Sequence, residues 1–114
     1  MTVVDETTKT VPICEVGCLI PGRGVAALLP DGSQVAIFRT ESDEFYALSN
    51  IDPFARAAVL SRGITGDAQG VPFVASPMLK QRFDLRTGSC LDDESVAVRT
   101  YPTRIVEGVV HICP

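Results

Sequence analysis

The sequence has few of the residues on which most enzyme active sites depend. It contains a single histidine, His111, which lies within the apolar run VVHIC near the C-terminus. A serine or cysteine nucleophile needs a base within hydrogen-bond reach, and that base is usually histidine. In a catalytic triad of this chain, His111 would have to be the base. It is explained more simply as a residue of a terminal strand.

Long apolar runs and concentrated positive charge are also absent. No apolar stretch approaches the length of a membrane-spanning helix, and the N-terminal MTVVDETTKT has neither the basic nor the apolar region of a signal peptide. The net charge is -4, and the densest basic cluster, Lys80, Arg82 and Arg86, is too small for the cationic face that nucleic acids require. We therefore expect a cytoplasmic protein that binds neither membranes nor nucleic acids.

The cysteines leave two interpretations open. Cytoplasmic thiols stay reduced, so we expect buried thiols rather than disulfides at all four positions: Cys14, Cys18, Cys90 and Cys113. His111 and Cys113 would share one face of a strand, and the first two cysteines would complete a nitrogen–sulfur set that suits zinc. The spacing lacks a tight glycine turn around both thiols, so packing is the preferred interpretation and zinc the alternative.

Two further motifs lack the context that their chemistry needs. The acidic run Asp92-Asp93-Glu94 lies in an expected turn beside Cys90, and a catalytic carboxylate pair would need burial to shift its pKa. The PGRG stretch at residues 21–24 is not followed by a helical pattern, as a phosphate-binding loop would be. On these residues alone the chain is a small β domain without a free-standing active site.

What the sequence does contain is a succession of short β-compatible runs separated by turn residues. Residues 24–29 and 34–38 are apolar runs on either side of Pro-Asp-Gly-Ser, which predicts a hairpin. Within the run at 71–75, Pro72 indicates an edge strand or a strand start. The remaining predicted strands cover residues 44–48, 82–85, 95–101, 103–106 and 109–113.

These runs predict the fold class and the domain limits. Residues 54–60 are expected to form one or two helical turns that end near Gly63 in a left-handed conformation. With about nine short strands and almost no helical periodicity, the chain is predicted to be an all-β sandwich or barrel. Its length suits one domain, which we place at residues 11–114 after a flexible polar end at residues 1–10.

Two stretches together resemble the ligand loops of a Rieske ferredoxin domain. ALSNIDP at residues 47–53 matches the first loop, Cys-x-His, and SPMLKQRFDL at residues 76–85 matches the second, Cys-Pro-x-His-Gly-x-x-Phe-Asp. VLSRGITGD between them and the Arg-Thr-Gly turn at residues 86–88 extend the similarity, which covers residues 11–112. The resemblance implies a Rieske-like small β-sandwich or barrel with two tip loops.

The resemblance also implies that the cluster ligands are missing. Asn50 and Asp52 stand at the first cysteine and histidine, and Ser76 and Leu79 stand at the second pair. A Rieske [2Fe–2S] centre needs two thiolates and two imidazoles. We therefore expect no metal, no cofactor and no catalytic residue in this chain.

NIDPF and the SPMLKQRF block are similar to the small subunit of the assimilatory NAD(P)H-dependent nitrite reductases. That resemblance implies a non-catalytic accessory subunit of an enzyme whose large subunit carries FAD, an iron–sulfur cluster and sirohaem and reduces nitrite to ammonium in nitrate assimilation. Two alternatives remain: a Rieske-type electron carrier that uses the cysteines outside the loops, and a generic β interaction module.

The resemblance places the two loops side by side, where they would contact the large subunit. Exposed apolar and cationic side chains suit such an interface. The expected contacts are Ile51, Phe54, Met78, Leu79, Lys80 and Arg82. Alternatively, Phe54, Leu79 and Phe83 fill the space of the missing cluster, and Asn50 and Asp52 only form turns.

Overall fold

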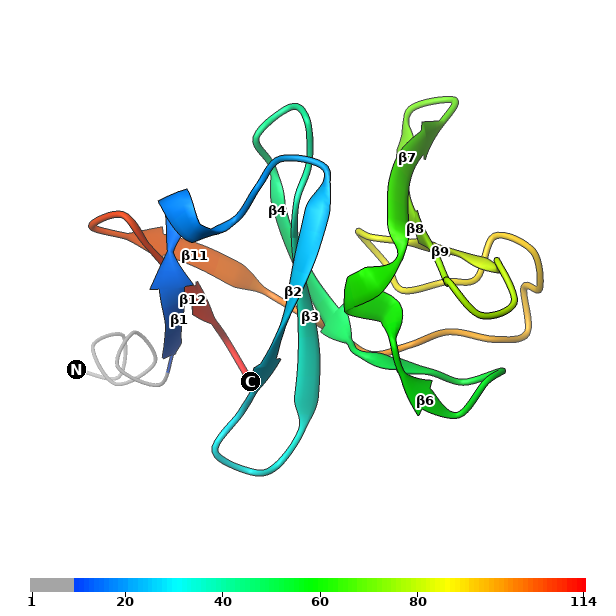
Figure 1. Cartoon of the computed structure of the whole chain (residues 1–114), viewed down its shortest axis with the longest axis horizontal. Coiled ribbons are helices and arrows are strands. Elements are labelled where there is room, and N and C mark those ends of the chain that lie inside the picture. Colours follow the sequence, from blue (N-terminus) through cyan, green and yellow to red (C-terminus); the bar gives the residue numbers. More distant parts are fainter. Residues whose placement is uncertain (1–9) are drawn as a thin grey trace.

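The computed structural model describes residues 10–114, which form short β-strands and two single turns of 3-10 helix (Figure 1). The expected flexible end at residues 1–10 lies, apart from Thr10, outside the described residues. Among those described, no helix is long and apolar enough to cross a bilayer. The elements are β1 (Val11–Glu15), η1 (Val16–Cys18), β2 (Arg23–Leu28), β3 (Gln34–Arg39), β4 (Phe45–Ser49), β5 (Ile51–Asp52), β6 (Ala57–Ala58), η2 (Leu60–Arg62), β7 (Ile64–Ala68), β8 (Val71–Ala75), β9 (Arg82–Asp84), β10 (Thr100–Tyr101), β11 (Thr103–Val106) and β12 (Val109–Ile112).

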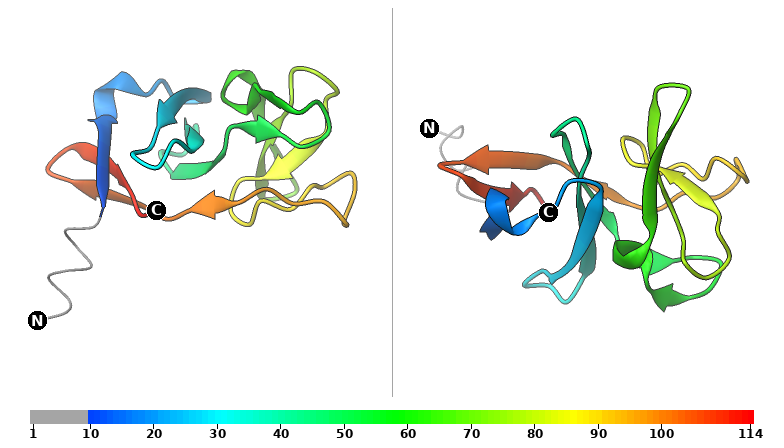
Figure 2. Two further views of the ribbon diagram at one scale, coloured as in Figure 1. Left: turned by 90° about the horizontal axis from the view of Figure 1, so that it is seen from below. Right: turned by 45° about the horizontal axis from the view of Figure 1, so that its top comes forward.

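The strands form four small antiparallel sheets, which confirms the all-β prediction. A middle sheet in the order β10-β4-β3-β2 separates a β1-β12-β11 sheet from a β7-β8-β9 sheet, and β5 and β6 form a separate two-stranded ribbon. Figure 2 shows these layers side by side along the long axis, with the β5–β6 turn at the end away from the chain termini. The segment between β9 and β10 returns the chain from that end to the middle sheet.

Strand β3 is buried on both of its faces. Successive side chains of a strand point to opposite sides. Val35 and Ile37 belong to a first core shared with β1, β12 and η1, whereas Ala36 and Phe38 belong to a second core shared with η2, β8 and β9. Burying a side chain such as Phe38 stabilises the fold by about 1.5–3 kcal/mol.

The predicted hairpin at residues 24–38 is confirmed as β2 and β3, paired from Arg23 opposite Arg39 to Leu28 opposite Gln34. The turn is closed by a hydrogen bond from the Leu29 N–H to the Ser33 carbonyl at 2.9 Å. Gly32 takes a φ of 92°, a conformation that is open to glycine at no steric cost.

The predicted helical turns at residues 54–60 were wrong. The Asp52 carboxylate accepts hydrogen bonds from the N–H groups of Phe54 and Ala55, at 2.8 and 3.3 Å. The Asp52 carbonyl also accepts the N–H of Arg56, whose φ is 56°. This turn reverses the chain, so that β6 pairs with β5. The helical element between β5 and β7 is the short 3-10 turn η2, which ends directly before Gly63.

Three smaller expectations also need correction. β8 is the central strand of its sheet, so the edge interpretation of Pro72 was wrong. Pro72 is the second residue of β8, as the strand-start alternative allows, and its carbonyl accepts the Leu85 N–H at 2.9 Å. Of residues 95–101 only Thr100–Tyr101 forms a strand, because the Val96 carbonyl and the Val98 N–H bond instead to the segment around Cys90.

The cysteines are free thiols, but only one of them is buried. Cys90 is buried, Cys14 and Cys113 are half-buried, and Cys18 is exposed because η1 lies at the surface.

Gly63 does not adopt the predicted left-handed conformation, but the close approach of a neighbouring strand requires a glycine there. Its φ is -75°, but a Cβ at this position would lie 2.3 Å from the Ala75 carbonyl oxygen. We predict that Gly63→Ala lowers the free energy of unfolding by about 1–3 kcal/mol, because β7 must move away from β8. Urea unfolding measures this, with Gly17→Ala as the control, since a Cβ there meets nothing within 4 Å. Equal effects of the two substitutions would contradict the prediction.

Candidate functional site

The structure joins the two loops that the sequence singles out. We call residues 50–54 the first loop and residues 76–82 the second loop. The first follows β4 and contains β5, and the second connects β8 to β9. The Ser76 hydroxyl donates a hydrogen bond to the Asp52 carboxylate, and both residues are buried. The expected adjacency of the loops therefore depends on a specific contact between two side chains.

Asn50 anchors the first loop to the second core. It is buried, and its side-chain oxygen accepts the Ser61 N–H at 2.7 Å. Its backbone carbonyl accepts the Leu60 N–H at 3.1 Å, and its own N–H donates to the Gln34 carbonyl at 3.0 Å. Asn50 is thus more than a turn former. Ser61 was not predicted as a site residue, although it belongs to the LSRG motif that carries the resemblance.

The second loop is closed by hydrogen bonds to Ser76. The Ser76 N–H donates to the Gln81 carbonyl at 2.9 Å, and the Ser76 carbonyl accepts the Lys80 N–H at 3.0 Å. The Ser76 hydroxyl also accepts the Met78 N–H at 3.2 Å. Lys80 adopts a φ of 67°, which turns the chain back toward β9. The side-chain oxygen of Gln81 is buried without a hydrogen-bond partner in the described part of the chain.

Leu79 does not pack into the interior of the domain. It is 55% exposed, as is Met78. Phe83 is fully buried in the second core, and the ring centroid of Phe54 lies 6.2 Å from that of Phe83. The alternative of a packing role is therefore wrong for Leu79, whereas the two phenylalanines pack against each other.

The six expected contact residues do not form one continuous patch. Met78, Leu79 and Lys80 are exposed together on the second loop. Ile51 is 39% exposed but lines a different cleft, beside Val98, Arg99 and Tyr101. Phe54 is half-buried, and Arg82 is engaged by Asp92, so neither is as accessible as the second loop.

Two ion pairs follow the second loop. Asp84 is nearly inaccessible, and its carboxylate accepts the Arg86 N–H at 2.8 Å and two guanidinium contacts at 3.3 Å. Burial raises the pKa of Asp84, but the hydrogen bonds and charge of Arg86 outweigh it and hold the pKa below its ordinary value. Arg82 pairs with Asp92 at 2.9 Å, where both side chains are accessible and the pair contributes less.

The side chains at the four matched positions do not suit an iron–sulfur centre. They offer one amide, one carboxylate, one hydroxyl and one aliphatic group, with neither thiolate nor imidazole. The polar groups among them already satisfy one another or the backbone. The zinc alternative also fails, since in residues 10–114 no three His, Cys, Asp or Glu side chains converge. His111 instead shares a hydrogen bond with the Thr10 hydroxyl at 3.0 Å.

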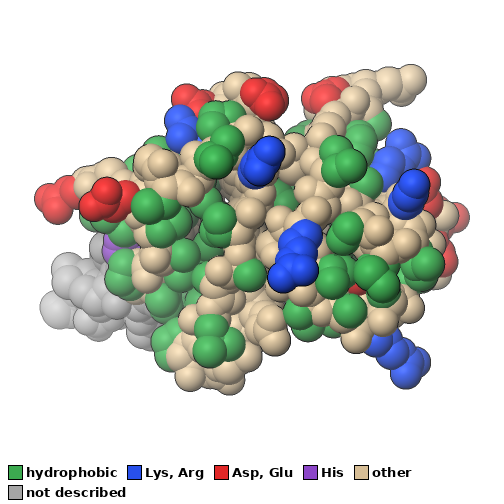
Figure 3. Space-filling view, viewed as in Figure 1, with side chains coloured by type: hydrophobic (Ala, Val, Ile, Leu, Met, Phe, Trp, Pro, Cys, Tyr) green, Lys and Arg blue, Asp and Glu red, His purple; other side chains and the backbone are tan. Residues whose placement is uncertain are grey.

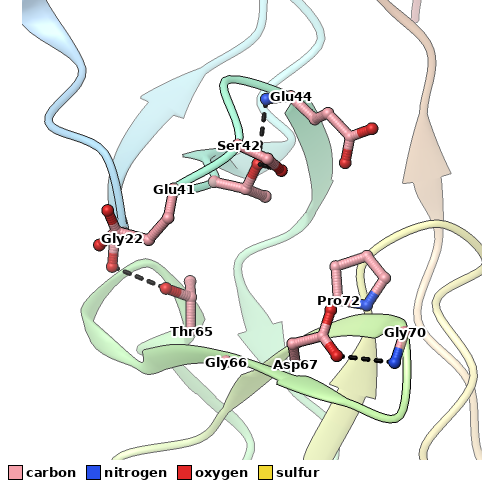
Figure 4. A pocket seen from close by; sticks show the side chains of 10 residues that line it. Gly22, Glu41, Ser42, Glu44, Thr65, Gly66, Asp67, Gly70 and Pro72 are labelled. Carbon is pink, nitrogen blue, oxygen red and sulfur yellow. Dashed lines mark hydrogen bonds between the residues drawn. The ribbon is translucent and has the colours of Figure 1, made fainter.

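A cleft of about 450 Å³ lies between the β3–β4 turn and the β7–β8 hairpin (Figure 4). Thr65 donates a hydrogen bond to the Gly22 carbonyl at 2.8 Å across its floor, and Asp67 accepts the Gly70 N–H at 2.7 Å. Glu41 and Glu44 line the opposite wall. Figure 3 shows acidic side chains over both of these turns, so the cleft is an acidic feature separate from the two loops.

Comparison with known proteins agrees with the sequence motifs. Residues 9–113 match the model of the Rieske-like [2Fe-2S] domain family. The nitrite reductase (NADH) small subunit of Salmonella typhimurium is 50% identical over 101 residues, which cover 88% of this chain and 93% of that protein. The chain belongs to the family of Rieske-like nitrite reductase (NADH) small subunits. The predicted Rieske-like fold is thereby confirmed.

Two further relatives extend the family assignment. A solved chain from Mycobacterium tuberculosis, assigned as an NADH-dependent nitrite reductase small subunit, superposes with a TM-score of 0.88 at 52% identity, covering 90% of this chain and 92% of its own. The nitrite reductase [NAD(P)H] large subunit of Klebsiella oxytoca is 42% identical over 100 residues, covering 88% of this chain but 10% of that protein. The domain therefore occurs both as a separate small subunit and as part of a larger chain.

The ion pair between Asp84 and Arg86 predicts a pH-dependent stability. Because the pKa of Asp84 is lowered in the folded state, its contribution is present above its ordinary value of 3.8 and is lost as the pH falls through the folded pKa. We predict that Asp84→Asn lowers the free energy of unfolding at pH 7 by about 1–2 kcal/mol. The difference from the unmodified chain should shrink as the pH falls below 3.8 and through the folded pKa.

Urea unfolding at pH 7 and at low pH measures this difference. Asp92→Asn is the matched control, because the side chain of Asp92 is 37% exposed whereas that of Asp84 is 9% exposed, so solvent screens the pair of Asp92 with Arg82 more strongly. A loss for Asp84→Asn that is no greater than the control loss, or that persists unchanged at low pH, would contradict the assignment.

Proposed function

We propose that this chain is a non-catalytic accessory subunit that binds and supports the nitrite reductase large subunit. The proposal rests mainly on one observation. The loops that would hold a Rieske cluster are closed instead by hydrogen bonds among Asn50, Asp52, Ser76 and the backbone. The chain then has no redox group of its own. The FAD, iron–sulfur cluster and sirohaem that reduce nitrite to ammonium belong to the large subunit.

The chemistry of the loops supports the absence of a cluster. A [2Fe–2S] centre binds soft thiolate sulfur, which a serine hydroxyl and an asparagine amide do not replace. The Asp52 carboxylate is committed to the Ser76 hydroxyl and to two backbone N–H groups. Inserting a cluster would require breaking these buried hydrogen bonds, and the unpaired polar groups would then cost free energy.

The Klebsiella oxytoca relative supports the partner. Its large subunit contains a domain that is 42% identical to 88% of this chain. A domain that occurs within the large subunit in one organism and as a separate chain in others needs a surface that contacts the rest of the enzyme. We therefore propose that the separate chain binds the large subunit noncovalently.

The second loop is the best candidate for that contact. It exposes Met78 and Leu79 next to each other, with the cationic Lys80 beside them. Adjacent apolar side chains with a cation beside them suit the centre of a protein–protein contact.

We place the enzyme in the cytoplasm. Free thiols at all four cysteines suit that reducing compartment.

Reconstitution of the enzyme tests the proposal. The chain and its cognate large subunit are co-expressed, and nitrite-dependent oxidation of NADH and NADPH is measured with the large subunit alone and with the complex. A stable complex whose flavin and sirohaem absorption comes from the large subunit would support the accessory role. A large subunit that neither binds the chain nor changes in activity or stability would leave a generic β interaction module as the better description.

Replacing Leu79 by a charged residue should separate binding from folding. We predict that Leu79→Asp weakens large-subunit affinity by about tenfold or more, because an apolar contact would become a buried charge. The free energy of unfolding should change by no more than about 0.5 kcal/mol, since the side chain is exposed. Calorimetric titration of the large subunit and urea unfolding of the variant measure the two effects.

Ile20→Asp is the matched control, because Ile20 is 59% exposed and lies between η1 and β2, outside both loops. Equal losses of affinity in both variants would exclude the second loop as the contact.

Iron analysis of the purified chain tests the missing cluster directly. We predict iron far below the two atoms per chain that a [2Fe–2S] centre holds, with no visible absorption from sulfur-to-iron charge transfer. A Rieske ferredoxin expressed in the same host serves as the control for cluster supply. Near-stoichiometric iron in this chain would make it an electron carrier instead.

A further inference from the structure

We propose that the hydrogen bond between Ser76 and Asp52 is a positioning device that holds the second loop in the shape which the large subunit recognises. This inference rests on the proposed function, because it names the residues that control the proposed contact. In a metal-bearing Rieske domain the cluster ligands link the two loops. Here the link consists of one hydroxyl and one carboxylate on residues 24 positions apart in the sequence.

The exposed part of the second loop has little else to hold it. Residues 77–80 are all exposed, so no apolar core fixes their conformation. Their shape depends on hydrogen bonds to Ser76, which accepts the Met78 N–H on its hydroxyl and the Lys80 N–H on its carbonyl. Lys80 also holds a φ of 67°, which a residue with a side chain adopts only where its surroundings enforce it.

Ser76 is held in turn from the first loop. Its hydroxyl donates to Asp52, whose other carboxylate oxygen accepts the N–H groups of Phe54 and Ala55. Asp52 is completely buried, and it follows Asn50, which is bound to η2 and β3. The position of Met78 and Leu79 is therefore connected, through Ser76 and Asp52, to the rigid middle sheet.

The Ser76 hydroxyl acts as a donor and as an acceptor at the same time. Ser76 uses its one hydroxyl proton toward Asp52, which leaves the oxygen lone pairs for the Met78 N–H. An alanine at this position would leave a buried carboxylate oxygen without its donor and the Met78 N–H without its acceptor. An alanine at position 52 would remove the carboxylate that accepts the Ser76 hydroxyl. An asparagine there would not break the link, because its N–H₂ group can donate to the second lone pair of the serine oxygen.

A double-mutant cycle on large-subunit affinity tests the inference. The variants are Ser76→Ala, Asp52→Ala and the combination, titrated as full-length folded chains against the large subunit. We expect each single variant to weaken binding by about tenfold. The combination should be no more than about threefold weaker than either, because both substitutions break the same link.

Ser95→Ala is the matched control, since Ser95 donates a comparable hydrogen bond to Asp93 at 2.6 Å, at an exposed site. It should leave the affinity unchanged. Multiplicative losses in the combined variant, or binding by Ser76→Ala that equals that of the unmodified chain, would overturn the inference.

Hydrogen exchange in the isolated chain reports on the second loop separately from the global stability of the domain. The Lys80 N–H bonds to the Ser76 carbonyl, which Ser76→Ala retains. Its exchange should nevertheless rise by about tenfold if the hydroxyl holds the loop, while amides of β3 keep their protection. Unchanged Lys80 exchange would overturn the positioning role.

The affinity and exchange results distinguish the two proposals. If the unmodified chain fails to bind the large subunit, the proposed function fails, whatever the exchange result. If the unmodified chain binds and Ser76→Ala binds equally well, only the positioning role is overturned.

Discussion

Burial of β3 on both faces is the constraint on which the rest of the structure depends. Val35 and Ile37 face one core while Ala36 and Phe38 face the other, so this strand must pack simultaneously against two sheets. A shift of its register by one residue would exchange the two sets of side chains. The β2–β3 turn with Gly32 sets this register, and β4 repeats the division with Ala47 and Leu48.

The two loops are held in place by hydrogen bonds to elements that pack in the second core. Asn50 leaves β4 directly beside β3 and accepts the Ser61 N–H of η2, which packs Leu60 against the buried face. Asp52 then connects to Ser76 at the end of β8. Buried polar groups persist only when they are hydrogen-bonded, and the Asn50, Asp52 and Ser76 side chains meet that requirement without a metal. Hydrogen bonds between side chains of the two loops in this way hold both loops in an ordered structure.

The second loop and the acidic cleft are separate surface features. The second loop exposes Met78 and Leu79, whereas the cleft between the β3–β4 turn and the β7–β8 hairpin is lined by carboxylates (Figures 3 and 4). Acidic groups resist association with other acidic surfaces, and apolar groups favour it with a dry partner.

The sequence by itself determined the β class, the first hairpin and the mismatch between the loop residues and a metal cluster. These features depend on local patterns: alternation, an Asp-Gly turn, and the identity of side chains at Asn50, Asp52, Ser76 and Leu79. The short η2 turn and the fate of residues 95–99 were not predictable in this way, because hydrogen bonds to distant segments override local propensity there. Only the tertiary structure decided that Leu79 is exposed, that the rings of Phe54 and Phe83 are in contact, and that Ser76 binds Asp52. Each depends on which surfaces meet when distant strands pack, and a sequence pattern carries no such distances.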